Sequence, residues 1–220
     1  MDTANHGADR RGRLYLARHG RTALNARGQL RGRLDPDLDD VGRVEALLLG
    51  DVLARSGGTV VVSSPLCRAL ETAEAIASCL GAPVRTDPRL TDRDYGRWAG
   101  WTIEEIAAEW GSVDDAPGVE PGTEVRTRAL EALGDIWRTH HSPSVAVSHD
   151  AVNRAILCAL DPSLCTESRI SQPTGCVNII DWDDRTWSVV ATGLLPRDAK
   201  GRIAQTEIAV TPNERAAVRT

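Results

Sequence analysis

The chain has 220 residues, of which 41% are hydrophobic, and it carries a formal net charge of −5 at neutral pH. This length and composition suffice for one domain with a buried core. The negative balance gives no overall attraction to nucleic acid or to an anionic membrane, so an anion would have to be bound by locally clustered arginines. No apolar run approaches the roughly 18 residues of a membrane span, and none follows the charged N-terminus as in a signal peptide. We therefore expect a cytoplasmic protein without a nucleic-acid or membrane partner.

The two ends of the chain differ from its middle. Residues 1–12 and 197–220 are rich in charged, glycine and small polar residues and lack sustained apolar periodicity, which predicts flexible ends. Between them, residues 13–196 alternate short apolar runs with helical patterns and form the predicted domain. This alternation predicts an α/β fold, a three-layer α/β/α sandwich with a mostly parallel central sheet.

The first half of the domain begins with a strand at 14–17, followed by a helix at 40–55 with apolar residues at helical spacing. A second buried strand is expected at 59–63. Ser64 is the expected N-cap, and Pro65 the first residue, of a helix that runs to about Leu80.

The second half begins with residues 95–121, a mixed segment predicted to be a small insertion over the C-terminal ends of the strands. A helix with apolar residues from Val125 to Trp137 follows, and then a strand at 145–147. A helix at 151–160 and closing strands at 177–182 and 187–192 complete the predicted domain.

The five cysteines are odd in number and show neither a CxxC pair nor metal-ligand spacing. Free thiols in a reducing compartment are the simplest interpretation. They are Cys67, Cys79, Cys158, Cys165 and Cys176.

Three predicted strands end in polar residues. The first runs into Arg18 and His19, the second into Ser64 with Arg68 one turn later, and the third into His149. Because ligands of open α/β sheets bind outside the carboxyl ends of the strands, we expect these groups to meet in one crevice. A neutral imidazole can attack phosphorus, and guanidinium groups bind and stabilise phosphate oxygens. The combination therefore indicates phosphoryl transfer.

Five blocks of this sequence, in order, resemble the histidine phosphatase (phosphoglycerate mutase-like) superfamily, in its branch with an Arg-His-Gly motif. They are LYLARHGRTALN at 14–25, LDPDLDDVGRVEA at 34–46, SSPLCRALETA at 63–73, LTDRDYGRWAGWT at 90–102 and VAVSHDAVNRAIL at 145–157. One Arg-His-Gly alone is a weak signal, but five ordered blocks are a strong one. The resemblance implies a metal-independent phosphatase without a cofactor that acts on small phosphate esters.

The resemblance also implies site roles, position by position. His19 would be the phosphorylated nucleophile, Arg18, Arg68 and His149 the rest of the phosphate pocket, and Asn25 a neutral donor to the same oxygens. Asp92 stands where this branch usually has the Glu that donates a proton. Asp150 stands where Gly is commoner, and Arg21 where Glu or Gln is commoner.

Several alternatives remain open at this stage. The general acid is either Asp92 or Asp150, although Asp150 also suits a helix cap. A phosphoglycerate mutase would use the same phosphohistidine, but the segment between Asp92 and His149 is short, as in the phosphatase members. A metal-dependent hydrolase conflicts with several fixed cations, which repel a divalent ion, and a catalytically weak phosphate-binding member is a further alternative. The sequence also leaves a homodimer open.

The segment from Tyr95 to Glu124 suggests a substrate class. It contains seven acidic residues and one basic residue, Arg97. If this segment covers the pocket, a second anionic group on the substrate meets like charge, which favours a monophosphate with a neutral organic part. Trp98, Trp101 and Trp110 lie in the same segment, where packing is the commoner role of tryptophan and a substrate platform the alternative.

Overall fold

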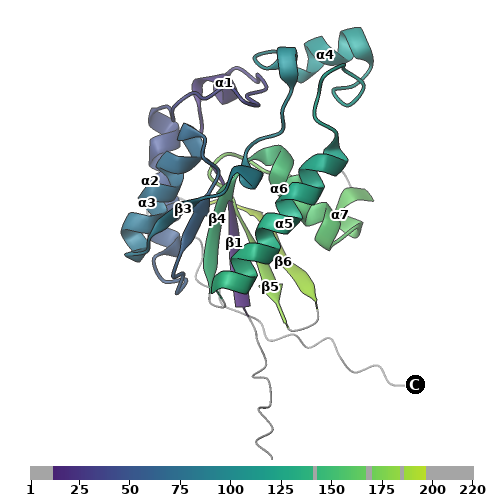
Figure 1. Ribbon diagram of the computed structural model, residues 1–220. Coiled ribbons are helices and arrows are strands. Elements are labelled where there is room, and N and C mark those ends of the chain that lie inside the picture. The colour runs from purple at the N-terminus through teal and green to yellow at the C-terminus, as the bar shows by residue number, and fades with distance from the viewer. Residues whose placement is uncertain (1–11, 141–142, 167–169, 184–185, 197–220) are drawn as a thin grey trace, which may run out of the picture.

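The computed structural model describes residues 12–140, 143–166, 170–183 and 186–196 (Figure 1). Its described strands form one six-stranded sheet in the order β3-β2-β4-β1-β5-β6. The strands are β1 (Gly12–Arg18), β2 (Val61–Ser63), β3 (Val84–Thr86), β4 (Ser144–Ser148), β5 (Val177–Trp182) and β6 (Trp187–Leu194). β3, β2, β4 and β1 are parallel neighbours, whereas β5 and β6 are antiparallel, so the predicted mostly parallel sheet is confirmed.

The described helices are α1 (Ala23–Ala26), α2 (Asp40–Leu53), α3 (Cys67–Leu80), α4 (Ile103–Trp110), α5 (Gly122–His140), α6 (Asp150–Leu160) and α7 (Ser163–Thr166). Two 3-10 turns, η1 (Pro88–Leu90) and η2 (Gly96–Trp98), lie between β3 and α4. None of the helices in the described ranges is long and apolar enough to cross a bilayer.

Alternate residues of β1 face two hydrophobic cores. Leu16 packs in a cluster with residues of α5 and α6, including Leu133, whereas Tyr15 packs in a cluster with residues of α2 and α3, including Leu49 and Ile76. The period of two along a strand places successive side chains on opposite faces of the sheet. Helices therefore cover both faces, and the three-layer prediction is confirmed.

The insertion has a small core of its own. Leu30, Tyr95, Trp98 and Ile106 belong to a third buried cluster. Figure 1 shows α1 and α4 together at one end of the molecule, beyond the edge of the sheet where β1 ends. The insertion thus lies over the C-terminal ends of the strands, as predicted.

The predicted start of α3 is wrong by two residues. The helix begins at Cys67 with Leu66 as its N-cap, not at Pro65 with Ser64 as the cap. Its first free backbone N–H, that of Cys67, donates to the Asp35 carboxylate of another loop at 2.7 Å. The cap therefore comes from a residue distant in sequence, which leaves Ser64 for a different contact.

Other predicted details also need correction. The strand β3 was not predicted, because three residues at a sheet edge, two of them exposed, carry no clear apolar pattern. Cys158 and Cys165 are joined by a disulfide, with Cα atoms 5.5 Å apart, so the expectation of five free thiols is wrong for this pair. The turn from α6 to α7 brings these two cysteines together. The predicted flexible segment 1–12 is wrong at Gly12, which is the first residue of β1, and residues 1–11 and 197–220 lie outside the described residues.

Candidate active site

Three neighbouring parallel strands end side by side. Arg18 at the end of β1 pairs with Ser148 at the end of β4, and Ser63 of β2 pairs with Val147 of β4. The backbone N–H of His19 donates to the carbonyl of Ser148 at 3.1 Å. This register places the imidazoles of His19 and His149 with their centroids 5.1 Å apart. The strand ends predicted to converge therefore meet in the structure.

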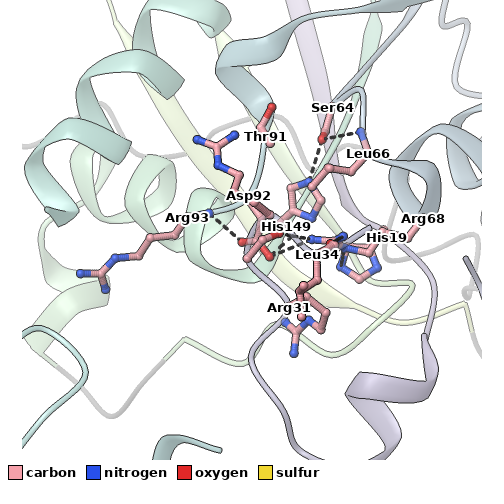
Figure 2. Close-up of polar contacts among 12 residues, drawn as sticks. His19, Arg31, Leu34, Ser64, Leu66, Arg68, Thr91, Asp92, Arg93 and His149 are labelled. Carbon is pink, nitrogen blue, oxygen red and sulfur yellow. Dashed lines mark hydrogen bonds and ion pairs between the residues drawn. The ribbon is translucent and has the colours of Figure 1, made fainter. Parts of the chain in front are cut away.

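The tautomer of His19 is fixed by its two neighbours (Figure 2). Nδ1 lies 2.6 Å from the carbonyl oxygen of Gly20, which can only accept, so Nδ1 carries the proton. Nε2 accepts from Nε of Arg68 at 3.3 Å and therefore holds the lone pair. Burial, and after it the charges of Arg68, Arg18 and Arg31, lower the pKa of His19 well below its ordinary value. The ring is neutral at physiological pH, with its nucleophilic nitrogen turned toward a guanidinium.

Arg68, on the first turn of α3, is fully buried and makes contacts in several directions. Its Nη1 donates to the carbonyl of Leu34 at 2.8 Å, and its Nη2 donates to the carbonyl of Gly32 at 3.0 Å. Nη2 also donates to Oδ2 of Asp92 at 3.0 Å. These bonds hold the guanidinium in one orientation beside His19, which is the preorganisation that anion binding requires.

Asp92 and His149 are two further buried residues near the guanidinium of Arg68. Asp92 is 1% exposed, and its Oδ1 accepts from the backbone N–H of Arg93 at 2.9 Å. Its Oδ2 lies 3.9 Å from Nδ1 of His149. The Nε2 atom of His149 lies 2.8 Å from the hydroxyl of Ser64, whereas Nδ1 is buried without a hydrogen-bond partner among the described residues. Burial first, and then the charge of Arg68, lower the pKa of His149 well below its ordinary value. A hydroxyl that donates to Nε2 leaves the proton on Nδ1, where it can be donated to a ligand.

Arg18, which precedes His19 in the chain, lines a cavity of about 820 Å³. Arg18 is 8% exposed, donates from Nη1 to the carbonyl of Gln172, and has no partner at Nε in the described part of the chain. Asn25 lines the same cavity, and because its Oδ1 accepts from Thr22, its NH₂ group is the one available to a ligand. The two residues thus present donors to one space.

Arg21 and Asp150 also line the cavity, but each has a partner. Nε of Arg21 donates to Asp39 at 2.9 Å, and Oδ1 of Asp150 accepts from Nε of Arg154 at 2.6 Å. Asp150 is the first residue of α6 and His149 occupies the N-cap position, so the prediction that Asp150 caps this helix is wrong. Asp92, rather than Asp150, is the carboxylate that contacts Arg68 and approaches His149.

Two contacts of the site were not predicted from the sequence. Ser64 was predicted to be a helix cap, yet its hydroxyl contacts His149. Arg31 is 9% exposed and lines the cavity beside Arg18. No spacing rule points to either contact, because each depends on how loops from different parts of the chain fold together.

The acidic segment lines part of the cavity, but it does not give the cavity the acidic cover that the sequence predicted. Of its seven acidic residues only Asp114 lines the cavity, and its carboxylate pairs with Arg93 at 2.6 Å. Glu120 instead pairs with Arg128 at 2.7 Å. The tryptophans of the segment also do not line the cavity. Trp98 packs against Trp101 and Trp110, with centroids 5.4 and 6.0 Å apart, and this supports the packing interpretation.

The sheet and its two facing histidines are those of a known class. Residues 14–194 match the family model of the histidine phosphatase superfamily (branch 1), and the chain belongs to this family. A glucosyl-3-phosphoglycerate phosphatase of Mycolicibacterium vanbaalenii is 37% identical over 67% of this chain and 73% of the relative. Phosphoserine phosphatase 1 of Hydrogenobacter thermophilus is 32% identical over 67% of this chain and 75% of the relative. Among solved structures, Bacillus stearothermophilus YhfR superposes with a TM-score of 0.75 at 30% identity, covering 83% of this chain and 96% of that one.

Proposed function

We propose that this chain hydrolyses phosphate monoesters of small organic molecules and that His19 is the covalent nucleophile. The observation that carries the proposal is the buried, neutral imidazole of His19, whose Nε2 lone pair faces the fixed guanidinium of Arg68. The relatives named as phosphatases, at 32–37% identity, support the same reaction class.

In the first half of the reaction, Arg18 and Arg68 bind the oxygens of the phosphoryl group, and Nδ1 of His149 and the amide of Asn25 donate to them. Nε2 of His19 attacks phosphorus, so that an N–P bond forms as the P–O bond to the leaving group breaks. The fixed cations stabilise the charge spread over the transferred oxygens.

Asp92 supplies the proton to the departing oxygen. In the free enzyme its carboxylate pairs with Arg68. A bound phosphate competes for that guanidinium and places negative charge beside the carboxyl group, and both changes favour the protonated form. Asp150 instead accepts from Arg154 at 2.6 Å, whereas Asp92 contacts Arg68 beside His19, and this geometry favours Asp92 as the acid.

In the second half, water attacks the phosphohistidine and gives its proton to the carboxylate of Asp92. Inorganic phosphate leaves, and the free imidazole is restored. We propose that no metal or other cofactor takes part, because Arg18 and Arg68 already supply the cations and would repel a divalent ion. Within the described residues, no three His, Cys, Asp or Glu side chains gather as metal ligands.

The proposal is tested on p-nitrophenyl phosphate and an alkyl phosphate with the His19→Ala variant. We expect a loss of at least about 10³-fold in kcat/KM, as for removal of a nucleophile. Alkaline quenching during turnover should trap phosphate on His19, and the label should be lost in acid. The matched control is His140→Gln, at the end of α5, which should retain activity. A phosphate label on another residue, or substantial activity in His19→Ala, would contradict the mechanism.

Two further measurements separate this function from its alternatives. Free phosphate released without an isomerised product distinguishes hydrolysis from a mutase reaction. Activity that persists in EDTA distinguishes the proposed mechanism from a metallohydrolase, whose activity would be lost and then restored by a divalent ion.

A further inference from the structure

Five arginines line the cavity among the described residues, and they fall into two groups. Three have a carboxylate partner within 3 Å: Arg21 with Asp39, Arg93 with Asp114 and Arg154 with Asp150. The other two, Arg18 and Arg31, have no ion pair within 4 Å in the part of the chain that the structure describes. Arg18 adjoins the proposed nucleophile and is assigned to the transferred phosphoryl group, so among the described cavity arginines Arg31 has neither a carboxylate partner nor an assigned role.

Arg31 is buried and held in place. Its side chain and backbone together are 9% exposed, and its Nη1 donates to the carbonyl of Gln29 at 2.9 Å. Its Nε is buried without a hydrogen-bond partner among the described residues. The neighbouring backbone is fixed, since the N–H of Leu30 donates to Trp101 at 2.8 Å and the carbonyl of Gly32 accepts from Arg68. A buried guanidinium with an unused donor and no counter-charge is unfavourable unless a ligand supplies the anion.

The charge of Arg31 affects the two buried histidines, His19 and His149. The pKa of His19 is lowered first by burial, then by Arg68 and Arg18, and then by Arg31. The pKa of His149 is lowered first by burial, then by Arg68 and His19, and then by Arg31. In Figure 2 Arg31 lies on the opposite side of these histidines from Ser64. Arg31 therefore lines the cavity and also lies close enough to both histidines for its charge to act on them.

The rest of the cavity wall indicates what reaches Arg31. Apolar side chains line it, including Leu30, Ile103 and Val113, and can contact a carbon skeleton. The planar fork of one guanidinium matches the two oxygens of a carboxylate, and the single unpaired charge equals that of one carboxylate. A second phosphate group would place roughly two negative charges beside this single cation.

We propose that Arg31 binds a carboxylate on the organic part of the substrate, so that the enzyme prefers carboxylate-bearing phosphate monoesters. This inference rests on the proposed phosphatase function and replaces the sequence-based expectation of a neutral organic group. It assigns to Arg31 specificity for the leaving part of the substrate, and it assigns no bond to the transferred phosphoryl group.

Two pairs of substrates that differ by a carboxylate test this proposal. 3-Phosphoglycerate carries a carboxylate where glycerol 3-phosphate carries a hydroxymethyl group, and phosphoserine differs from phosphoethanolamine only by its carboxylate. We expect the wild-type kcat/KM to favour the carboxylate member of each pair by about 10-fold or more. Arg31→Gln should lower kcat/KM about 10- to 100-fold for the carboxylate members and less than about threefold for their partners.

Arg27→Gln, an exposed arginine in the same loop, is the matched control and should leave the preference unchanged. Equal losses for both members of a pair would mean that Arg31 binds the transferred phosphoryl group, and would overturn the proposal. A wild-type enzyme without the preference would overturn it as well, even if Arg31→Gln fails to fold. The His19→Ala variant tests the proposed function separately. Because both members of each pair react through the same nucleophile, that variant should lose activity on both, whatever the role of Arg31.

Discussion

Nε of Arg68 donates to Nε2 of His19 across 3.3 Å, and the same guanidinium contacts the carboxylate of Asp92 at 3.0 Å. One buried cation therefore lies between the proposed nucleophile and the proposed general acid. A phosphoryl group bound to this cation is placed within reach of both. The geometry explains why a residue in the first turn of α3 matters for the proposed chemistry at the ends of β1 and β4.

The Arg68→Lys variant tests this position of the guanidinium. Lysine keeps the charge but loses the planar fork, so we expect kcat/KM to fall about 10²-fold or more. Arg85→Lys, at an exposed position of β3, should have little effect. Thermal unfolding of both variants shows whether the loss reflects chemistry or stability. A folded Arg68→Lys enzyme with near wild-type activity would disprove the role.

The Asp92→Asn variant tests the proton donor. An alkyl leaving group needs protonation and p-nitrophenolate does not, so we expect a loss of about 10²-fold or more for an alkyl phosphate and a much smaller one for p-nitrophenyl phosphate. Asp150→Asn should affect the two substrates similarly and weakly. The reverse ranking of the two variants would assign the proton to Asp150.

The two buried histidines predict how stability depends on pH. The pKa values of His19 and His149 are lowered in the folded state, mainly by burial, so below about pH 6.5 the unfolded chain binds protons that the folded chain does not. Stability is therefore present above the unfolded pKa and falls as the pH drops below it. Each histidine that stays neutral in the folded chain lowers the free energy of unfolding by about 1.4 kcal/mol between pH 7.5 and pH 5.5. Urea unfolding should show a smaller loss for His19→Asn than for the wild type, and an equal loss would contradict the prediction.

The loop that follows His19 lies close to α2, and this close approach allows a further test. A Cβ atom at Gly42 would lie 2.0 Å from the carbonyl oxygen of Arg21, so Gly42→Ala must push the loop away from the helix. We expect a destabilisation of about 1–3 kcal/mol and reduced activity. In Gly134→Ala the new methyl group meets only the flexible end of Arg138, at 3.4 Å, and this variant should be neutral or slightly stabilising. Equal unfolding midpoints for the two variants would show that the loop adapts freely.

The sequence alone predicted the layers and the strand ends. Apolar runs such as Val145 to Val147 and the helical spacing of Val125, Ala129 and Leu133 are local patterns, and burial in a sheet or on one helix face follows from them directly. The convergence of His19 and His149 followed from the parallel sheet, because the carboxyl ends of parallel strands meet at one edge. The family resemblance added the roles of single residues, and these stay predictions until the variants are measured.

Only the tertiary structure decided which polar groups are paired. The hydroxyl of Ser64 contacts both the N–H of Leu66 and the imidazole of His149, while a carboxylate from another loop, that of Asp35, accepts from the first N–H of α3. Asp150 pairs with Arg154 four residues later on the same helix, whereas Asp92 contacts Arg68, 24 residues earlier in the chain, a contact that no local pattern predicts. Arg31 lacks a carboxylate partner within the described residues, and most of the acidic residues of the insertion do not line the cavity. Burial and pairing of a charge depend on groups that distant segments bring within a few ångströms, and no local pattern encodes those distances.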